Sequence, residues 1–175
     1  MINQSVRRSV PVIALVASAT VGVPVRAGAR QFHVGPSIGF DWSAGTLGST
    51  GGTITLDPAY DITDAWRLYG SAHYGLGLDG RSALRHAGSA TLGVAYVLDV
   101  LSVMPWIGVG IRGSVVFGAA NAGIPAVDAR LGVDYRPSRY FAWTVQVAYD
   151  LSIWNRDAVS DEFSASLGAR WTLDL

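Results

Sequence analysis

Hydrophobic and polar residues alternate with a period of two along the last segment of the chain, from Phe163 to Leu175. Its odd-numbered positions are apolar, and its even-numbered positions are polar residues or glycine. Successive side chains of a β-strand point to opposite faces, so one face of this segment suits lipid and the other suits a polar interior. The segment is therefore predicted to be a membrane-spanning β-strand.

The same alternation recurs along residues 30–175, in eight runs of about 9 to 13 residues, the length that a tilted membrane strand requires. Connections of unequal length separate them, so the predicted fold is all-β: an eight-stranded antiparallel up-and-down transmembrane β-barrel with both ends on the periplasmic side. The predicted strands cover residues 32–42, 53–62, 66–76, 89–98, 107–115, 127–135, 141–151 and 163–175, with longer loops at 43–52, 79–88, 118–125 and 154–162.

Outward-facing aromatic residues gather at two levels of this barrel. Membrane barrels carry such girdles at both interfaces, whereas a water-soluble barrel has no reason to sort aromatic residues to its two rims. The pattern therefore favours a membrane protein over a soluble sandwich. The turn-end girdle is predicted to contain Phe32, Tyr60, Trp66, Tyr96, Tyr135, Phe141 and Trp171, and the loop-end girdle Trp42, Tyr74, Phe117, Tyr149 and Phe163.

Charged residues occupy inward positions of the predicted strands. A register shift of one residue would expose Arg112, Arg130 and Arg170 to lipid, at about 2 to 4 kcal/mol each near the midplane. We interpret the inward set as a salt-bridge network that fills the lumen, because an eight-stranded barrel is just wide enough for side chains. A charged pore or proton path is the alternative. The predicted network is Asp57, Arg67, His73, Arg112, Asp128, Arg130, Asp134, Asp150 and Arg170.

A membrane-spanning helix is a second interpretation of one apolar segment, residues 91–111. It contains Pro105, which breaks helices, and Asp99, which would be costly within a membrane. Two strands are therefore the preferred prediction.

The N-terminal segment has the pattern of a secretory signal peptide. A basic pair at residues 7–8 precedes an apolar stretch at 10–25, and Ala27 and Ala29 are small residues at the positions that a signal peptidase reads. The alternative, an N-terminal membrane anchor, is disfavoured because prolines and polar residues interrupt the apolar stretch. Residues 1–29 are thus predicted to be cleaved, leaving the barrel.

Composition excludes several kinds of function. The chain has no cysteine, which rules out disulfides and thiolate metal sites. Basic and acidic residues balance at 13 each, so no basic surface for nucleic acid is expected.

The three histidines do not form a recognisable metal or catalytic motif. His33, His73 and His86 are scattered and lack metal-ligand spacing, so neither a metal nor a cofactor is predicted. His73 with Asp57 on the neighbouring strand resembles a base and its orienting acid, but no nucleophile motif accompanies the pair. The chain is therefore predicted not to be an enzyme, with a lipid-modifying barrel enzyme as a minor alternative.

The barrel pattern resembles the small outer-membrane barrels of the OmpA and OmpX kind. The segment from Asp99 to Gly110 is similar to the turn and Pro-aromatic-x-Gly-x-Gly strand of that group. The resemblance implies a Gram-negative outer-membrane location, contact with outer-membrane lipid and insertion by the barrel assembly machinery. The terminal Leu175 departs from the Phe or Trp that usually ends the assembly signal.

These observations predict a monomeric cell-envelope protein of structural or interaction type, with a plugged lumen and surface-exposed loops whose partner is open. A narrow porin-like pore or small-molecule transporter is the alternative.

Overall fold

The computed structural model describes residues 31–43, 49–79, 84–99, 102–117, 123–153 and 161–174. The expected signal peptide, with Ala27 and Ala29, lies outside these residues. Among the residues described, no helix has the length and hydropathy needed to cross a membrane.

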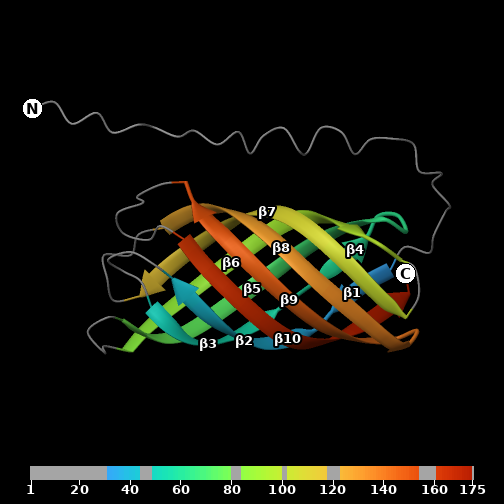
Figure 1. Cartoon of the computed structure of the whole chain (residues 1–175), viewed down its shortest axis with the longest axis horizontal. Coiled ribbons are helices and arrows are strands. Elements are labelled where there is room, and N and C mark those ends of the chain that lie inside the picture. Colours follow the sequence, from blue (N-terminus) through green and yellow to red (C-terminus); the bar gives the residue numbers. More distant parts are fainter. Residues whose placement is uncertain are drawn as a thin grey trace, which may run out of the picture.

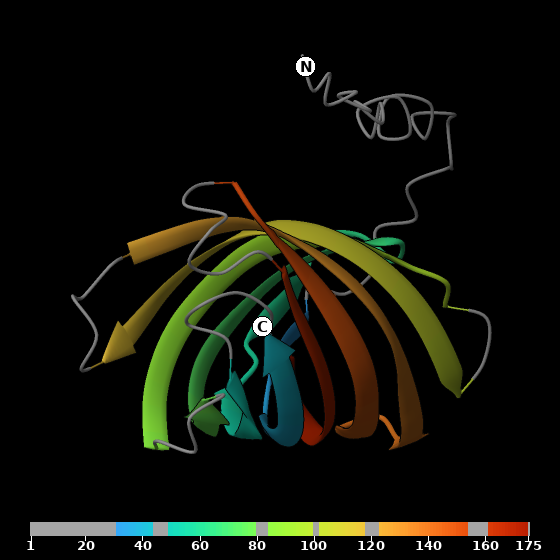
Figure 2. The same cartoon turned by 60° about the vertical axis from the view of Figure 1, so that its left-hand side comes forward.

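One antiparallel sheet closes on itself into a ring (Figures 1 and 2). The strands are β1 (Gln31–Val34), β2 (Pro36–Ser43), β3 (Ser49–Leu56), β4 (Ala59–Asp61), β5 (Trp66–Asp79), β6 (Leu84–Val97), β7 (Val103–Phe117), β8 (Gly123–Ser138), β9 (Phe141–Ser152) and β10 (Asp161–Asp174). Each strand from β5 to β9 pairs with the next, and β10 pairs with both β1 and β2. The ring closes because β2 pairs with β3, and both β3 and β4 pair with β5. β1 and β2 together form one strand of the barrel, interrupted at Gly35, and β3 and β4 together form another. The ring therefore has eight strands, and the predicted eight-stranded barrel is confirmed.

Two of the predicted strands are interrupted. The first breaks at Gly35, where a Cβ atom would lie 1.8 Å from the carbonyl oxygen of Ala169, so only glycine permits this approach of β10. The second breaks at Asp57 and Pro58, but the backbone hydrogen bonds continue: Asp57 N–H donates to Gly35 O at 2.9 Å. The ring therefore stays closed across both breaks.

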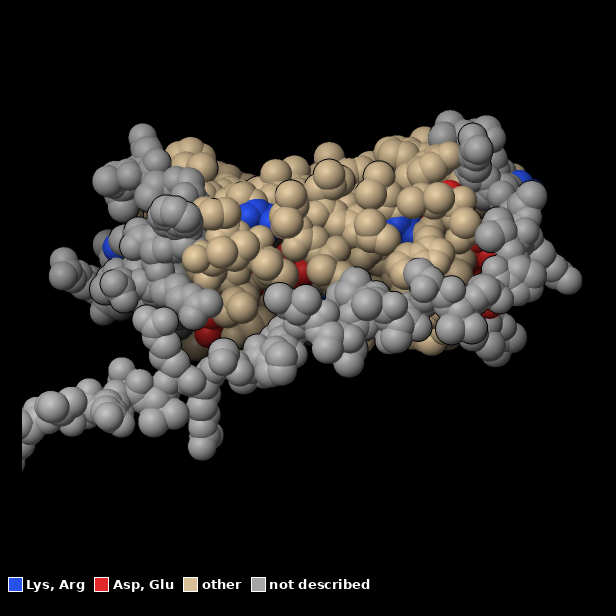
Figure 3. Space-filling view, turned by 90° about the horizontal axis from the view of Figure 1, so that it is seen from above, with Lys and Arg blue, Asp and Glu red and all other residues tan. Residues whose placement is uncertain are grey.

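The outer wall is apolar. Ile111 is 69% exposed and Ile38 66%, and the other large exposed side chains of the strands are also hydrophobic or aromatic. The face shown in Figure 3 is uncharged over most of the area that the described residues cover. Such a surface suits lipid contact and not water.

Outward aromatic residues pair near both rims. At the turn end, where residues 62–65, 98–102 and 139–140 connect strands, the Trp66 and Tyr96 rings are 5.3 Å apart. At the loop end, Phe163 lies opposite Trp42 on one neighbouring strand and Tyr149 on the other. These pairs include members of both predicted girdles.

The strands extend further towards the loop end than predicted. Residues 49–52, 84–88 and 161–162 are in strands, although the sequence analysis placed them in loops. Their side chains do not alternate cleanly between apolar and polar, because they lie towards the rim, where lipid no longer imposes the pattern. The helical alternative for residues 91–111 is wrong, since β6 and β7 cover most of that segment.

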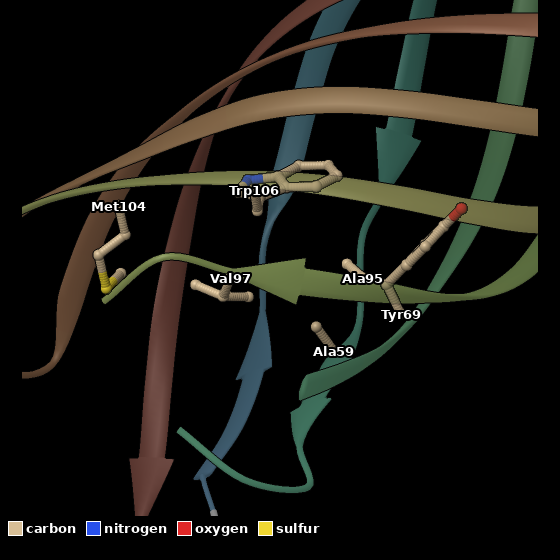
Figure 4. Packing of buried hydrophobic residues seen from close by; sticks show 6 residues of the cluster. All are labelled: Ala59, Tyr69, Ala95, Val97, Met104 and Trp106. Carbon is tan, nitrogen blue, oxygen red and sulfur yellow. The ribbon is translucent and has the colours of Figure 1, made fainter. Parts of the chain in front are cut away.

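The buried apolar cluster is small and lies inside the barrel (Figure 4). Tyr69 and Trp106 provide its large rings, which lie where inward glycines leave space. A Cβ atom on Gly93 would lie 2.5 Å from the Tyr69 ring, and one on Gly132 would lie 2.4 Å from the Trp106 ring. The full cluster is Ala59, Tyr69, Ala95, Val97, Met104 and Trp106.

Candidate functional site

The barrel interior is a set of buried polar side chains, which divide into three clusters along the barrel. The turn-end cluster centres on Asp134, which is fully buried. Its Oδ2 accepts hydrogen bonds from Arg67 Nη1 at 2.7 Å and Arg170 Nη1 at 2.9 Å. Its Oδ1 accepts from Thr144 Oγ1 at 2.8 Å and Trp106 Nε1 at 3.1 Å. One carboxylate of β8 thus links β5, β7, β9 and β10.

The turn-end cluster continues through Arg67 to a second carboxylate. Arg67 Nε donates to Asp61 Oδ1 at 2.7 Å, and His33 Nε2 lies 2.7 Å from Asp61 Oδ2. His33 Nδ1 is 2.9 Å from Thr172 Oγ1 on β10. The ends of the first and last strands are therefore joined by side chains as well as by the backbone.

The central cluster is built around Arg130. Its Nε donates to both oxygens of Asp128, at 2.8 and 2.9 Å, and its Nη2 donates to Ser71 Oγ at 2.9 Å. The guanidinium also lies 5.1 Å from the centre of the Tyr69 ring, whose hydroxyl donates to Asp128 at 2.6 Å. Asp57 completes the cluster, with its Oδ1 4.0 Å from Arg130 Nη1.

The loop-end cluster contains an ion-paired arginine, Arg112, and a histidine–carboxylate pair, His73 with Asp41. Arg112 binds Asp150, and its Nη2 lies 2.6 Å from Glu162 Oε1. His73 Nε2 lies 2.7 Å from Asp41 Oδ2, and its Nδ1 is 3.3 Å from Thr55 Oγ1.

The structure does not bring His73 and Asp57, the pair considered for the enzyme alternative, together. Asp57 instead accepts a hydrogen bond from Ser37 Oγ at 2.7 Å and lies in the central cluster. Alternation along a strand gives the face of a residue but not which inward residues of tilted neighbouring strands lie at the same height. The tilt brings Asp41 of β2 to His73, and Asp57 lies beyond the end of β3.

A pocket opens at the loop end of the barrel, next to the His73–Asp41 pair. Its lining includes Asp41, His73, Arg112 and Glu162. Glycine supplies much of the remaining wall, which leaves space where larger inward side chains would close it.

The nine expected network residues are all inward and are distributed over the three clusters. Sequence reasoning missed Asp41, Asp61 and Glu162 as members, although Asp41 and Asp61 occupied inward positions of the predicted strands. Glu162 was placed in a loop, because the alternating pattern begins only at Phe163. Trp106 was also missed, and its signal was the inward Gly132 opposite it on β8.

No family model matches the chain, and no curated protein matches it. Solved structures do match. Neisserial surface protein A shares 16% identity over 82% of this chain and 97% of its own, with a TM-score of 0.63. The outer membrane protein OprG from Pseudomonas aeruginosa shares 14% identity over 84% and 97%, with a TM-score of 0.62. The chain has the fold of a small outer-membrane barrel.

A third small barrel, the attachment invasion locus protein Ail of Yersinia pestis, shares 16% identity over 83% of this chain and 99% of its own, with a TM-score of 0.53. At such identities the likeness concerns the fold. Together with the apolar outer wall, it supports the expected location in a cell outer membrane of the Gram-negative type, with lipid as the surrounding medium. The outer membrane enzyme PagL also matches, but at a TM-score of 0.49 it carries no argument about the chemistry of this chain.

Proposed function

We propose that this small outer-membrane barrel is a structural protein of the cell envelope, with a lumen closed by its own salt-bridge network and with loops available for contact at the cell surface. The proposal includes export by the signal peptide at residues 1–29, insertion by the barrel assembly machinery and a monomeric state.

The observation that carries the proposal is the cross-link at Asp134. Two guanidinium groups, one hydroxyl and one indole from four strands converge on a single fully buried carboxylate. Ions crossing the barrel would have to displace these contacts, and each hydrogen bond to a charged group contributes about 1.5 to 3 kcal/mol. A lumen built this way favours rigidity over conduction.

The interior also argues against the lipid-modifying alternative. Thr55, His73 and Asp41 form a row of hydroxyl, imidazole and carboxylate groups, the residue types of a hydrolytic triad. However, Thr55 is buried and faces the barrel interior, whereas an acyl chain would lie against the outer wall.

Planar-bilayer recording tests the closed lumen. Protein expressed as the full chain and purified from outer membranes in detergent is expected to give no conductance steps. A triple variant, with Arg67, Arg130 and Arg170 each replaced by Ser, removes the guanidinium groups of the turn-end and central clusters and is expected to conduct. Asp64→Asn, at an exposed turn residue, is the matched control and should stay silent. Steps in the unmodified protein would overturn the proposal and favour the narrow pore.

A further inference from the structure

The loop-end cluster brings three potential metal ligands to one point inside the barrel. Asp41 of β2, His73 of β5 and Glu162 of β10 each offer one ligand atom, and these atoms all lie within 4.8 Å of one another. The side chains are only 16%, 11% and 17% exposed, so they are held within the barrel wall and are not free surface groups. We propose that these three residues bind one divalent transition-metal ion, of which zinc is the reference case.

The contacts around the three residues suit metal binding. A metal-bound histidine usually has its second ring nitrogen held by a hydrogen-bond partner, which fixes the tautomer. His73 Nδ1 has Thr55 Oγ1 at 3.3 Å, and this leaves Nε2 for a metal. Arg112 likewise holds Glu162 through Oε1.

Two carboxylate oxygens of the loop-end cluster are buried and, among the described residues, unpaired. Three carboxylates, Asp41, Asp150 and Glu162, surround Arg112, which pairs with two of them. Within the described part of the chain, Asp41 Oδ1 and Asp150 Oδ1 are buried atoms with no hydrogen-bond partner. Buried carboxylate oxygens are normally paired or bound to a cation, because leaving them unpaired is costly. A dication beside Asp41 would pair with its buried Oδ1.

The cluster also has room for an ion and a path to it. It lines the pocket that opens at the loop end. Gly75 lies beside the His73–Asp41 pair. A Cβ atom at this position would lie 3.5 Å from His73 Nε2 and 3.6 Å from Asp41 Oδ2, so the absence of a side chain leaves space next to both atoms. Two ligands of a tetrahedral zinc ion lie roughly 3.4 Å apart, so His73 and Asp41 need only separate slightly from their present 2.7 Å.

The ligand types select the class of metal. One imidazole nitrogen and two carboxylate oxygens are ligands that zinc accepts, and three protein ligands leave a fourth position for water. Calcium requires six to eight oxygen ligands, which this cluster does not supply. The site is therefore expected to prefer zinc, cobalt or nickel to calcium and magnesium.

Zinc binding to the purified protein tests the proposal. The protein is expressed as the full chain without a polyhistidine tag, extracted from outer membranes in detergent, treated with chelator and titrated with zinc chloride by calorimetry. We expect one zinc ion per chain. Asp41→Asn, His73→Gln and Glu162→Gln should each weaken binding at least tenfold. The matched control is His86→Gln, at a histidine of the same barrel end that contacts Tyr74 and not the cluster.

Folding and geometry have their own readouts. A heat-dependent shift in gel mobility shows that each variant still forms a barrel. Cobalt should give the intense visible absorption of a four-coordinate site in the unmodified protein and in the His86→Gln control, but not in the three ligand variants. Absence of stoichiometric zinc binding would overturn the proposal. The proposal would also be overturned if the folded His73→Gln variant bound zinc as tightly as the unmodified protein, or if the His86→Gln control lost zinc binding to the same extent as the ligand variants.

Discussion

Replacing Asp134 with Asn tests whether the turn-end cluster stabilises the barrel. Asn keeps the size of the side chain and one oxygen, so Thr144 and Trp106 can still donate to it. The two guanidinium groups lose their shared negative charge, and Arg170 has Asp134 as its observed ion-pair partner. Removing one partner of a buried ion pair costs about 3 to 5 kcal/mol, because the opposite charge is left uncompensated. We expect a loss of stability in this range.

Urea titration followed by gel mobility measures this loss. The folded fraction is read from the unheated band in detergent or lipid vesicles. Tryptophan fluorescence is unsuitable here, because Trp106 contacts the substituted group and would respond directly. Asp64→Asn serves as the control, since the same chemical change at an exposed turn residue should alter stability by less than about 0.5 kcal/mol. If Asp134→Asn unfolds within about 1 kcal/mol of the unmodified protein, the cluster does not stabilise the barrel as argued.

Two further predictions concern the walls of the barrel. Gly132→Ala places a Cβ 2.4 Å from the Trp106 ring and should lower stability by about 1 to 3 kcal/mol, whereas Gly113→Ala, with no atom within 4 Å of its Cβ, should be nearly neutral. Equal urea midpoints for these two variants would contradict the packing argument. Ile111→Arg puts a charge on the exposed face near the middle of β7 and should cost about 2 to 4 kcal/mol in vesicles, with Ile111→Val as control. Unchanged stability there would contradict the lipid-facing assignment.

The barrel can be predicted from the sequence because contact with lipid requires the same alternation of apolar and polar residues in every strand. An apolar outer face and a polar inner face give a period of two, which identifies the strands and directs Arg112, Arg130 and Arg170 inward. This requirement weakens near the loop end, where water replaces lipid, and there the predicted strands end too early. For this reason Glu162 was not predicted to face the barrel interior.

Contacts between inward residues could not be predicted in the same way. The period gives the face of each side chain, but partners depend on strand tilt and on the stagger between strands, which alternation does not encode. The strand pattern could suggest Asp57 as a partner for His73, whereas the fold brings His73 to Asp41. Inward glycines can indicate where large inward rings pack, because the missing side chain on one strand leaves space for a ring from another strand, as Gly132 does for Trp106.

Closure between β10 and the first two strands has a consequence for how the barrel is made. The contact between His33 and Thr172 joins residues 139 positions apart, and closing a loop of that length costs about 4 kcal/mol in chain entropy. Until β10 arrives, the growing sheet has two unpaired edges, which attract other strands. The earlier strands therefore keep these unpaired edges until the last strand is in place, and the seam between β10 and the first two strands removes both.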